Sequence, residues 1–558
     1  MMIRKFLLTL SAMSLCAVYA LGQPAWVKKA TKSVFTLKTF APDGTLLGGS
    51  NGFFVGDDGT ALSSFTPFKG AQRAVVIDAA GKEYAVVCML GANETYDVAK
   101  FKVDVRKSQP LPLAASELSE SMSVWLLPYR EVKQVPAGRI AKTETFNGDY
   151  VYYTVEMSTP DNGVSAPLFN DAGEVVGLMQ QPSAPGSNQS YAVSARFANS
   201  VHVNGLSLSD PALRSTQIKK ALPADIDQAL LMLYFASKSA DSLSYVLMVD
   251  DFISQFPDRH DGYVYKAQLA ASAKDYASAD QEIARALKVA AKPEEVHFSY
   301  SRMIYQKNIY DAQTPYADWT LDKALAEVSA AERLNPQPGY LQHKAYVLFA
   351  QQKYDEAYGV YAHLFESSLR SAELFYEASR CKEMLADTTG QLALLDSAVA
   401  MFSRPYLRDA APYLLARAQA SMQVGKNRQA VSDLNDYEEL MKTQLSDRFY
   451  YLRHQAEVGG RLFQQALDDI DRAIEMNPDY DLYYAEKASL QVRVGLYDDA
   501  ISTSRRCIEL SPQYSEGFLF LGLAQCLKGQ KAEGLKNLQQ ARQLGDPQAD
   551  GLIEKYSE

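Results

Sequence analysis

The chain has 558 residues, 47% hydrophobic and 22% charged, which is typical of a soluble globular protein too long for a single hydrophobic core. Its formal net charge of −10 argues against nucleic acid as the main partner, because phosphate binding requires clustered lysine and arginine. Residues 24–205 hold 16 basic and 17 acidic residues, whereas the part after residue 205 holds 38 and 49. The acidic second part favours solubility and basic partners.

The first 22 residues have the pattern of a secretory signal peptide. Arg4 and Lys5 form a basic head, residues 6–20 are an apolar run, and Ala20 and Gly22 suit cleavage before Gln23. A retained membrane anchor is the alternative, but the run is shorter than the roughly 20 residues that span a bilayer. We therefore expect an exported protein, with residues 1–22 as the signal peptide and without stable membrane insertion.

Between about residues 33 and 201 the hydrophobic residues alternate with a period of two. Turn signals such as Asp57-Asp58-Gly59 separate the runs. The predicted strands lie at 33–38, 52–55, 74–77, 84–88, 98–103, 124–127, 150–155 and 175–179. Many short strands at this spacing predict an antiparallel barrel or sandwich.

Three segments in this region resemble the HtrA-like, trypsin-fold serine proteases. Segment 52–65, GFFVGDDGTALSSF, resembles the strand–turn–strand unit that leads to the catalytic histidine. Segment 96–103, YDVAKFKV, resembles the strand that carries the triad aspartate, and 162–170, NGVSAPLFN, with 173–177, GEVVG, resembles the nucleophile loop. The resemblance implies an all-β trypsin-like double barrel over residues 23–205, with Thr66, Asp97 and Ser165 at the three catalytic positions.

The histidine position departs from the family pattern. Thr66 stands where the histidine would align, and the chain has no histidine before His202. A Ser-His-Asp triad needs an imidazole that takes the serine proton and returns it to the leaving amine. Lys69 is the nearby substitute, but its ordinary pKa of about 10.4 makes it a poor base near neutrality.

The nucleophile loop departs from the pattern as well. A gap-free alignment puts Val164 at the serine position, and only a one-residue deletion brings Ser165 there. Ala166 replaces the second glycine and would crowd the backbone of the oxyanion hole. We expect a catalytically inactive pseudoprotease with Asp97 as a structural acid. The alternative is a residual serine peptidase that uses Ser165 with a non-histidine base.

From residue 218 onward the hydrophobic period becomes helical, with an echo of 34 residues near the C-terminus. The clearest unit consists of Tyr484, Ala488, Gly495, Tyr497, Ala500, Cys507, Leu510 and Pro512. This spacing resembles the tetratricopeptide repeat. The resemblance implies a linker at 206–222, a right-handed superhelix of eight to nine helix pairs at 223–547 and a capping helix at 548–558.

In such a superhelix the first helix of each pair lines the concave face. The candidate peptide-binding residues on this face are Tyr346, Phe349, Arg448, Tyr451, Gln455, Leu519 and Leu523. Some tetratricopeptide domains grip acidic C-terminal peptides with lysine and asparagine, but Gln342, Tyr346 and Phe349 stand at the corresponding positions. We expect a protein or peptide ligand on an aromatic, mixed surface, and no cofactor.

The cysteines and histidines do not suggest a metal. Outside the signal peptide, Cys88, Cys381, Cys507 and Cys526 show no C-x-x-C spacing, so we expect buried free thiols, with a Cys507–Cys526 bridge as the alternative. The histidines after His202 are scattered without i, i+4 pairing, at positions 260, 297, 343, 363 and 454.

The sequence thus predicts an exported protein-binding scaffold, with an inactive trypsin-like domain joined to a tetratricopeptide superhelix. Such a pairing resembles envelope proteins of Gram-negative bacteria, especially Bacteroidetes. It implies a location in the periplasm or at the cell surface, and is compatible with association with an envelope complex. A further alternative is that the barrel only caps the first end of the helical array.

Overall fold

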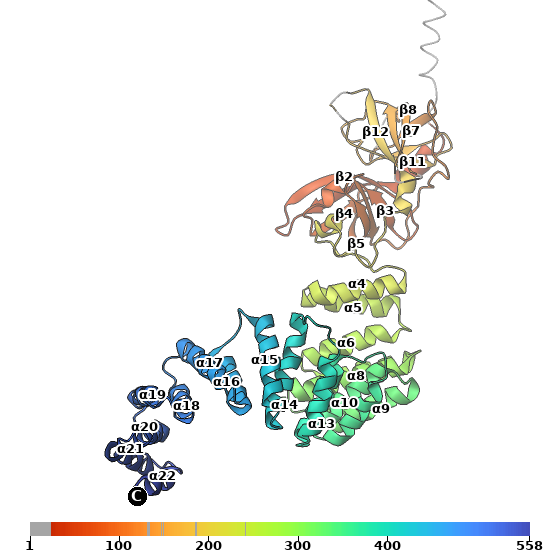
Figure 1. Ribbon diagram of the computed structural model, residues 1–558. Helices are drawn as coiled ribbons and strands as arrows, with labels where there is room; N and C mark the ends of the chain where they lie inside the picture. Colours follow the sequence, from red (N-terminus) through yellow and green to blue (C-terminus); the bar gives the residue numbers. More distant parts are fainter. Residues whose placement is uncertain are drawn as a thin grey trace, which may run out of the picture. The chain divides into compact units, whose positions relative to one another are not determined.

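The computed structural model describes residues 24–557 except 131–133, 147, 149, 183, 185–186 and 240, so the expected signal peptide lies outside the described residues. The chain forms two compact units, Met1–Leu269 and Ala270–Glu558, called here the N-terminal unit and the C-terminal unit. The N-terminal unit holds the strands and the first helices, and the C-terminal unit is helical (Figure 1).

Twelve described strands form two closed antiparallel barrels. The first, in the order β1-β2-β3-β6-β5-β4, contains β1 (Val34–Phe40), β2 (Leu46–Phe54), β3 (Thr60–Ser63), β4 (Arg73–Ile77), β5 (Glu83–Asn93) and β6 (Val98–Val103). The second, in the order β10-β11-β12-β9-β8-β7, contains β7 (Ser123–Leu126), β8 (Ala137–Phe146), β9 (Tyr150–Glu156), β10 (Pro167–Phe169), β11 (Val175–Met179) and β12 (Gln189–Ser194). The expected trypsin-like double barrel is confirmed.

The alternation of buried and exposed side chains along the strands shows where the barrel cores lie. In β1 the side chains of Phe35 and Leu37 are fully buried while Lys38 is exposed, as expected for a strand with one face inward. β11 is buried over its whole length, because it lies between β10 and β12 in the second barrel. The loops between these strands carry the protease-like centre described below.

Short helical turns and three longer helices complete the N-terminal unit. The turns are α2 (Val27–Ala30), η1 (Thr31–Ser33), η2 (Thr66–Phe68), η3 (Ala195–Asn199) and α3 (Pro211–Arg214). The longer helices are α4 (Ile226–Ser239), α5 (Ser242–Gln255) and α6 (His260–Ser272), the last of which runs into the C-terminal unit.

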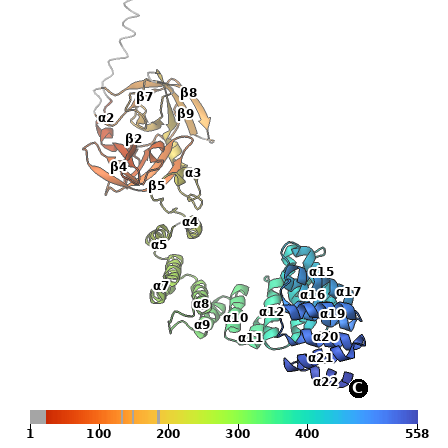
Figure 2. The same ribbon diagram turned by 90° about the vertical axis from the view of Figure 1, so that its left-hand side faces the viewer.

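The C-terminal unit is a succession of helices that pack as antiparallel hairpins (Figure 2). After α7 (Tyr276–Val289) follow α8 (Pro293–Tyr310), α9 (Leu321–Leu334), α10 (Pro338–Ala350), α11 (Tyr354–Leu364), α12 (Ala372–Met384), α13 (Thr388–Val399), η4 (Arg408–Ala410), α14 (Ala411–Gln423) and α15 (Asn427–Met441). The last helices are α16 (Asp447–Gly460), α17 (Phe463–Met476), α18 (Asp481–Arg493), α19 (Tyr497–Leu510), α20 (Ser515–Leu527), α21 (Lys531–Gln543) and α22 (Ala549–Ser557). The expected all-α array is confirmed.

Small residues allow the helices of a hairpin to approach closely. Ala488, Ala500 and Cys507, which the 34-residue spacing places at the helix contacts, are fully buried. In α20 and α21 the approach is closer still, because a Cβ added to Gly522 would lie 2.8 Å from the carbonyl oxygen of Gly534. The helices therefore pack as densely as the interior of a globular protein, and larger residues at these positions would force them apart.

The four cysteines at positions 88, 381, 507 and 526 are buried free thiols, as expected. The thiol of Cys507 donates to the carbonyl oxygen of Asp481 at 3.5 Å and forms no bridge to Cys526. Burial raises the pKa of both Cys381 and Cys507 to about 12, which keeps the thiols protonated. Within the described residues, no helix has the length and the apolar character needed to cross a membrane.

Candidate functional site

The first candidate site lies where the protease-like positions meet. Thr66 begins η2, which follows β3 after Ser64 and Phe65, and Asp97 precedes β6 with a left-handed backbone, φ 48°. The backbone N–H and the hydroxyl of Thr66 both donate to Oδ1 of Asp97, at 2.6 and 2.8 Å. The Asp97 carboxylate therefore fastens the turn that, in a working protease, would carry the histidine.

Lys69, the candidate substitute for the histidine, forms an ion pair elsewhere. The ammonium group of Lys69 pairs with the Glu94 carboxylate at 2.6 Å, and it lies 5.9 Å from the centre of the Phe65 ring. Both ion-pair partners are about half exposed. The ammonium group is thus directed at Glu94, and no contact between Lys69 and the hydroxyl of Ser165 is present among the described residues.

Ser165 is enclosed in the loop before β10. Its side chain is fully buried, its backbone has φ 65°, and its hydroxyl is hydrogen-bonded to the hydroxyl of Ser64. Only Phe65 separates Ser64 from Thr66, so the three predicted positions come together at one site. A serine hydroxyl in this environment faces another hydroxyl rather than a base.

The backbone N–H groups of the same loop already donate hydrogen bonds to carbonyl groups of the protein. Ser165 donates its N–H to the carbonyl of Met179 at 2.8 Å, Gly163 to Pro160 at 2.7 Å, and Ala166 to Gly163 at 3.1 Å. An oxyanion hole requires N–H groups that point at the position of the substrate oxygen. These three donors are instead used to close the loop.

A residue that the sequence analysis missed holds the loop in place. Asn51 in β2 is 7% exposed, and its side-chain amide donates to the carbonyls of Asn162 and Val164 at 2.6 and 2.8 Å. Its Oδ1 accepts the backbone N–H of Tyr129 at 2.8 Å. The only signal in the sequence is a polar side chain within an otherwise buried stretch of strand. Asn51 thus ties three segments of the N-terminal unit together.

Comparison with known proteins identifies the first domain. The family model described as a trypsin-like peptidase domain matches residues 50–178. Crystal structures of the Rv3671c protease from M. tuberculosis are similar in part: the active form at 16% identity, covering 36% of this chain and 86% of that chain with a TM-score of 0.29. The inactive form has 16% identity, covers 32% and 91%, and has a TM-score of 0.26.

Two curated relatives are also similar to parts of the chain. Superkiller complex protein 3 of Mus musculus is 26% identical over 300 residues, which is 51% of this chain and 18% of that protein. A protein SGT1 homolog of Bos taurus is 29% identical over 87 residues, 16% of this chain and 26% of that protein. The chain therefore matches only about a fifth to a quarter of the length of these relatives.

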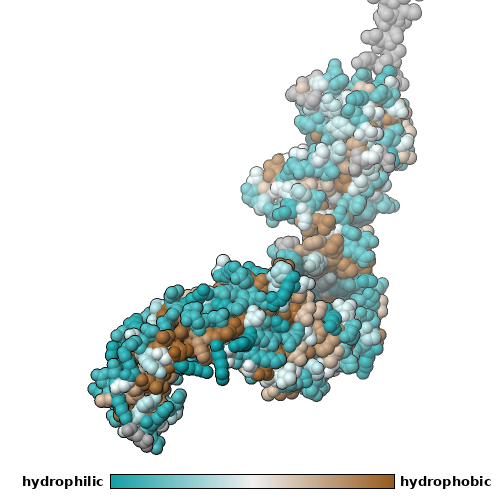
Figure 3. Space-filling view, viewed as in Figure 1, coloured by the Kyte–Doolittle hydropathy of each residue, from teal (hydrophilic) through white to brown (hydrophobic). Residues whose placement is uncertain are grey.

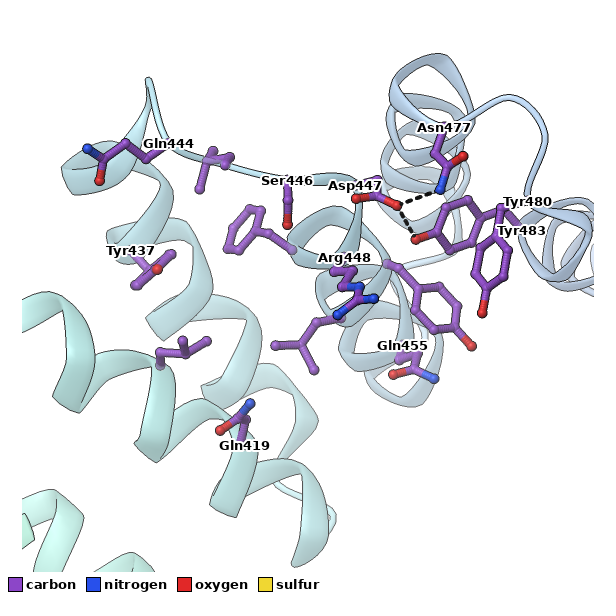
Figure 4. A pocket seen from close by; sticks show the side chains of 15 residues that line it. Gln419, Tyr437, Gln444, Ser446, Asp447, Arg448, Gln455, Asn477, Tyr480 and Tyr483 are labelled. Carbon is purple, nitrogen blue, oxygen red and sulfur yellow. Dashed lines mark hydrogen bonds between the residues drawn. The ribbon is translucent and has the colours of Figure 1, made fainter. Parts of the chain in front are cut away.

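The second candidate site is a cavity of about 660 Å³ in the C-terminal unit (Figure 4). Its walls come from α14, α15, α16, α18 and the segments that join them. The lining residues are Leu415, Gln419, Tyr437, Gln444, Leu445, Ser446, Asp447, Arg448, Phe449, Tyr451, Leu452, Gln455, Asn477, Tyr480 and Tyr483. Three of the predicted groove residues, Arg448, Tyr451 and Gln455, are among them. Along this part of the helical array, hydrophobic surface lies between stretches of hydrophilic surface (Figure 3).

The other predicted groove residues lie outside this cavity. Tyr346 is half-buried with its ring 6.4 Å from that of Tyr361, and Phe349 is half-buried under the guanidinium of Arg380, at 4.8 Å. Leu523 is half-buried in α20. Leu519 was expected on an exposed groove, but it is 1% exposed and packs in the core of α20–α22, which corrects that expectation.

Polar groups inside the cavity are arranged by hydrogen bonds. Asp447 accepts from the amide of Asn477 at 3.1 Å and from the hydroxyl of Tyr483 at 2.8 Å, and these bonds lower the pKa of its carboxyl (Figure 4). The hydroxyl of Tyr451 donates to Glu486 at 3.1 Å. Sequence reasoning missed Asn477 and Tyr480 because they lie in the turn between α17 and α18, outside the helical register. It also missed Tyr483, which lies in the first turn of α18.

The opposite face of α16 is anchored by a buried ion network. The guanidinium of Arg453 donates to Asp469 at 2.6 and 2.9 Å and to Glu438 at 2.5 Å. Desolvation and the neighbouring charge of Asp469 raise the pKa of Glu457, whose Oε2 is buried without a hydrogen-bond partner among the described residues. This network fixes the helix that presents Arg448, Tyr451 and Gln455 to the cavity.

Proposed function

We propose that this protein is an exported protein-binding scaffold that joins a catalytically inactive trypsin-like domain to a tetratricopeptide-like helical array. The proposed inactivity rests on one observation. The carboxylate of Asp97 accepts hydrogen bonds from Thr66, which stands at the position where a catalytic triad needs an imidazole. Without that imidazole, the described residues around Ser165 offer its hydroxyl only the hydroxyl of Ser64, which cannot take its proton and return it to a leaving group as a base would. The N–H groups of the nucleophile loop support the same proposal, because they are hydrogen-bonded to protein carbonyls and are not available for a substrate oxygen.

A fluorophosphonate probe tests the inactivity, because it reacts with activated serine nucleophiles. We expect the full-length protein to remain unlabelled, at the same level as Ser165→Ala, while trypsin in the same reaction is labelled. Labelling of the wild-type protein that disappears in Ser165→Ala would establish the second candidate, a residual serine peptidase with a non-histidine base.

The proposed binding function rests on the cavity between α14 and α18. A concave site of about 660 Å³ with several aromatic rings, four amide side chains and one exposed arginine is typical of a recognition site. A helical array builds such extended surfaces from successive hairpins. One relative carries the name of a complex subunit, which agrees with a role in assembly.

Capture from an envelope extract tests the binding function. Gln419 is exposed in α14 and lines the cavity, so Gln419→Trp should fill the cavity while leaving the core intact. We expect the proteins that immobilised wild-type chain enriches to be reduced at least tenfold by Gln419→Trp, as measured by quantitative mass spectrometry. The matched control is Gln539→Trp on the exposed face of α21. Equal capture by both variants would remove the cavity from the proposed function.

The proposed location follows from the first 22 residues. Their basic head, apolar run and small residues before Gln23 support export to the periplasm or cell surface of a Gram-negative bacterium. The acidic balance after residue 205 supports protein rather than nucleic acid as the partner.

A further inference from the structure

The side chain of Glu457 is buried in the C-terminal unit next to a second buried carboxyl group. Glu457 lies in the last turn of α16, and its side chain is 4% exposed. Asp469 on α17 is 5% exposed and near enough for a side-chain hydrogen bond to Glu457. Oε2 of Glu457 has no hydrogen-bond partner among the described residues. An ionised carboxylate at this position would be desolvated without the hydrogen bonds that stabilise its charge.

The cations near Glu457 are engaged by other carboxylates. Nε and Nη2 of Arg453 donate to Asp469 at 2.6 and 2.9 Å, and its Nη1 donates to Glu438. Oε1 of Glu457 is 4.0 Å from Nε of Arg453, beyond the distance of a hydrogen bond. Arg472 is 52% exposed and pairs with Glu438 at 3.3 Å. Two arginines thus face three carboxyl groups, and among the described residues neither arginine donates a hydrogen bond to Glu457.

The position of Glu457 in its helix also disfavours a negative charge, because the carbonyl groups of the last helical turn carry a partial negative charge. Burial lowers the pKa of His454, whose imidazole is hydrogen-bonded to the carbonyl oxygen of Ala466 at 2.8 Å. The other charged groups around α16 are exposed or bonded elsewhere: Arg461 after the helix, Asp468 on α17, Arg428 on α15, which donates to the Gly460 carbonyl, and Glu486 on α18, which accepts from Tyr451. Desolvation and the charge of Asp469 therefore raise the pKa of Glu457 above its ordinary value of 4.5.

We propose that Glu457 keeps its proton at neutral pH and donates it in a hydrogen bond to Asp469, so that the α16–α17 hairpin is stabilised by a proton that it loses as the pH rises. This pH dependence goes beyond the proposed function, and only its effect on binding rests on that function. α16 presents Arg448, Tyr451 and Gln455 to the cavity, so the cavity loses one wall when the hairpin opens (Figure 4).

The sign of the pH dependence follows from a proton that the closed hairpin keeps and the open hairpin releases. In the open hairpin the Glu457 side chain is in water and loses its proton at its ordinary pKa of 4.5. In the closed hairpin burial and Asp469 raise the pKa, so the proton stays bound above that pH. The stability that the proton gives is fully present below the ordinary pKa and is lost as the pH rises from there to the raised pKa. Over that range each pH unit shifts the equilibrium about tenfold towards the open hairpin.

The test compares hydrogen exchange of the full-length wild-type chain with that of Glu457→Gln, which keeps the length of the side chain and cannot ionise. The matched control is Glu439→Gln on α15, which removes a carboxylate that is 70% exposed and pairs with Lys442 at 2.6 Å. Exchange of the backbone amides in residues 447–476 is measured by mass spectrometry at pH 5, 6 and 7. The chains are compared at the same pH, so that the chemical rate of exchange cancels.

We expect the exchange rate of the wild-type hairpin, divided by that of Glu457→Gln, to rise about tenfold with each pH unit. The corresponding ratio for Glu439→Gln should not change with pH. Infrared spectra at pH 7 should show the C=O band of a protonated carboxyl group in the wild-type chain and not in Glu457→Gln. As the pH is raised, capture of partners from the envelope extract should fail about one pH unit or more earlier for the wild-type chain than for Glu457→Gln.

Three results would overturn the inference. An exchange ratio that does not change between pH 5 and 7, or the absence of an infrared band that Glu457→Gln removes, would show that Glu457 is ionised in the folded chain. An exchange ratio that rises equally in α8–α13 would assign the effect to the whole array rather than to the hairpin. The same pH dependence of capture in wild type and Glu457→Gln, with capture still blocked by Gln419→Trp, would separate the proton from the cavity and leave the proposed function in place. Equal capture by wild type and Gln419→Trp would instead remove the cavity's proposed function, while the pH dependence of exchange would still support the proton on Glu457.

Discussion

Replacing Arg453 with methionine is expected to lower the free energy of unfolding of the C-terminal unit by about 3–5 kcal/mol. The side chain of Arg453 is 6% exposed and neutralises Asp469 and Glu438 through short hydrogen bonds. Methionine replaces the aliphatic stem of arginine but has no charge, so the Asp469 carboxylate would remain buried without a counter-ion. Urea denaturation followed by circular dichroism measures the loss.

The matched control is Arg472→Met on the neighbouring helix. Its side chain is 52% exposed and pairs with Glu438 at 3.3 Å, so its removal should cost at most about 1 kcal/mol. Adding Asp469→Leu and Glu457→Leu to Arg453→Met should recover part of the stability, because the two most deeply buried carboxylates beside Arg453 are then absent as well. Equal stabilities of Arg453→Met and Arg472→Met would contradict the assigned role of the network.

Asn51→Leu is expected to destabilise the N-terminal unit by about 3 kcal/mol or more. Leucine has nearly the same shape, but it leaves the carbonyl of Asn162 and the N–H of Tyr129 without their partner. The carbonyl of Val164 keeps only the long hydrogen bond from the backbone N–H of residue 51, at 3.4 Å. Each buried polar group that loses its hydrogen bond costs about 1–3 kcal/mol. Hydrogen exchange with mass spectrometry should show faster exchange of the amides in 162–166, because the loop loses its attachment to β2.

The control for Asn51→Leu is a second asparagine of the same site. Asn162 is exposed, and its side chain reaches only the carbonyl of Tyr129, at 3.5 Å. Asn162→Leu keeps the main-chain carbonyl that Asn51 binds, so we expect a loss below about 1 kcal/mol and unchanged exchange in the loop. If both variants unfold alike, the loop is held by packing rather than by Asn51.

Strands with strong alternation could be predicted from the sequence, and weakly patterned strands could not. β1, β6 and β11 carry runs of valine, leucine and phenylalanine, and their predicted positions agree closely with the structure. β8 has Ile140 as its only fully buried residue and reads as polar, while β10 has only three residues. Pairing with β9 and β11 makes strands of segments that have little strand signal themselves.

The candidate sites were predictable to the extent that they lie on periodic elements. The helical register of α16 placed Arg448, Tyr451 and Gln455 on one face, and all three line the cavity. The same register gave no information on Tyr480, which lies in a turn, or on whether Leu519 would be covered by α22. Asn51 acts through residues more than a hundred positions away, and no local pattern indicates such contacts.

The walls of the cavity belong to three successive hairpins, since α14–α15, α16–α17 and α18–α19 each contribute to them. A stack in which each hairpin contacts only its neighbours behaves as an elastic rod. Any bend or change of pitch between α14 and α18 must therefore widen or narrow the cavity. A partner that grips the array elsewhere, or a mechanical load along it, would change the affinity of the cavity without touching a residue that lines it.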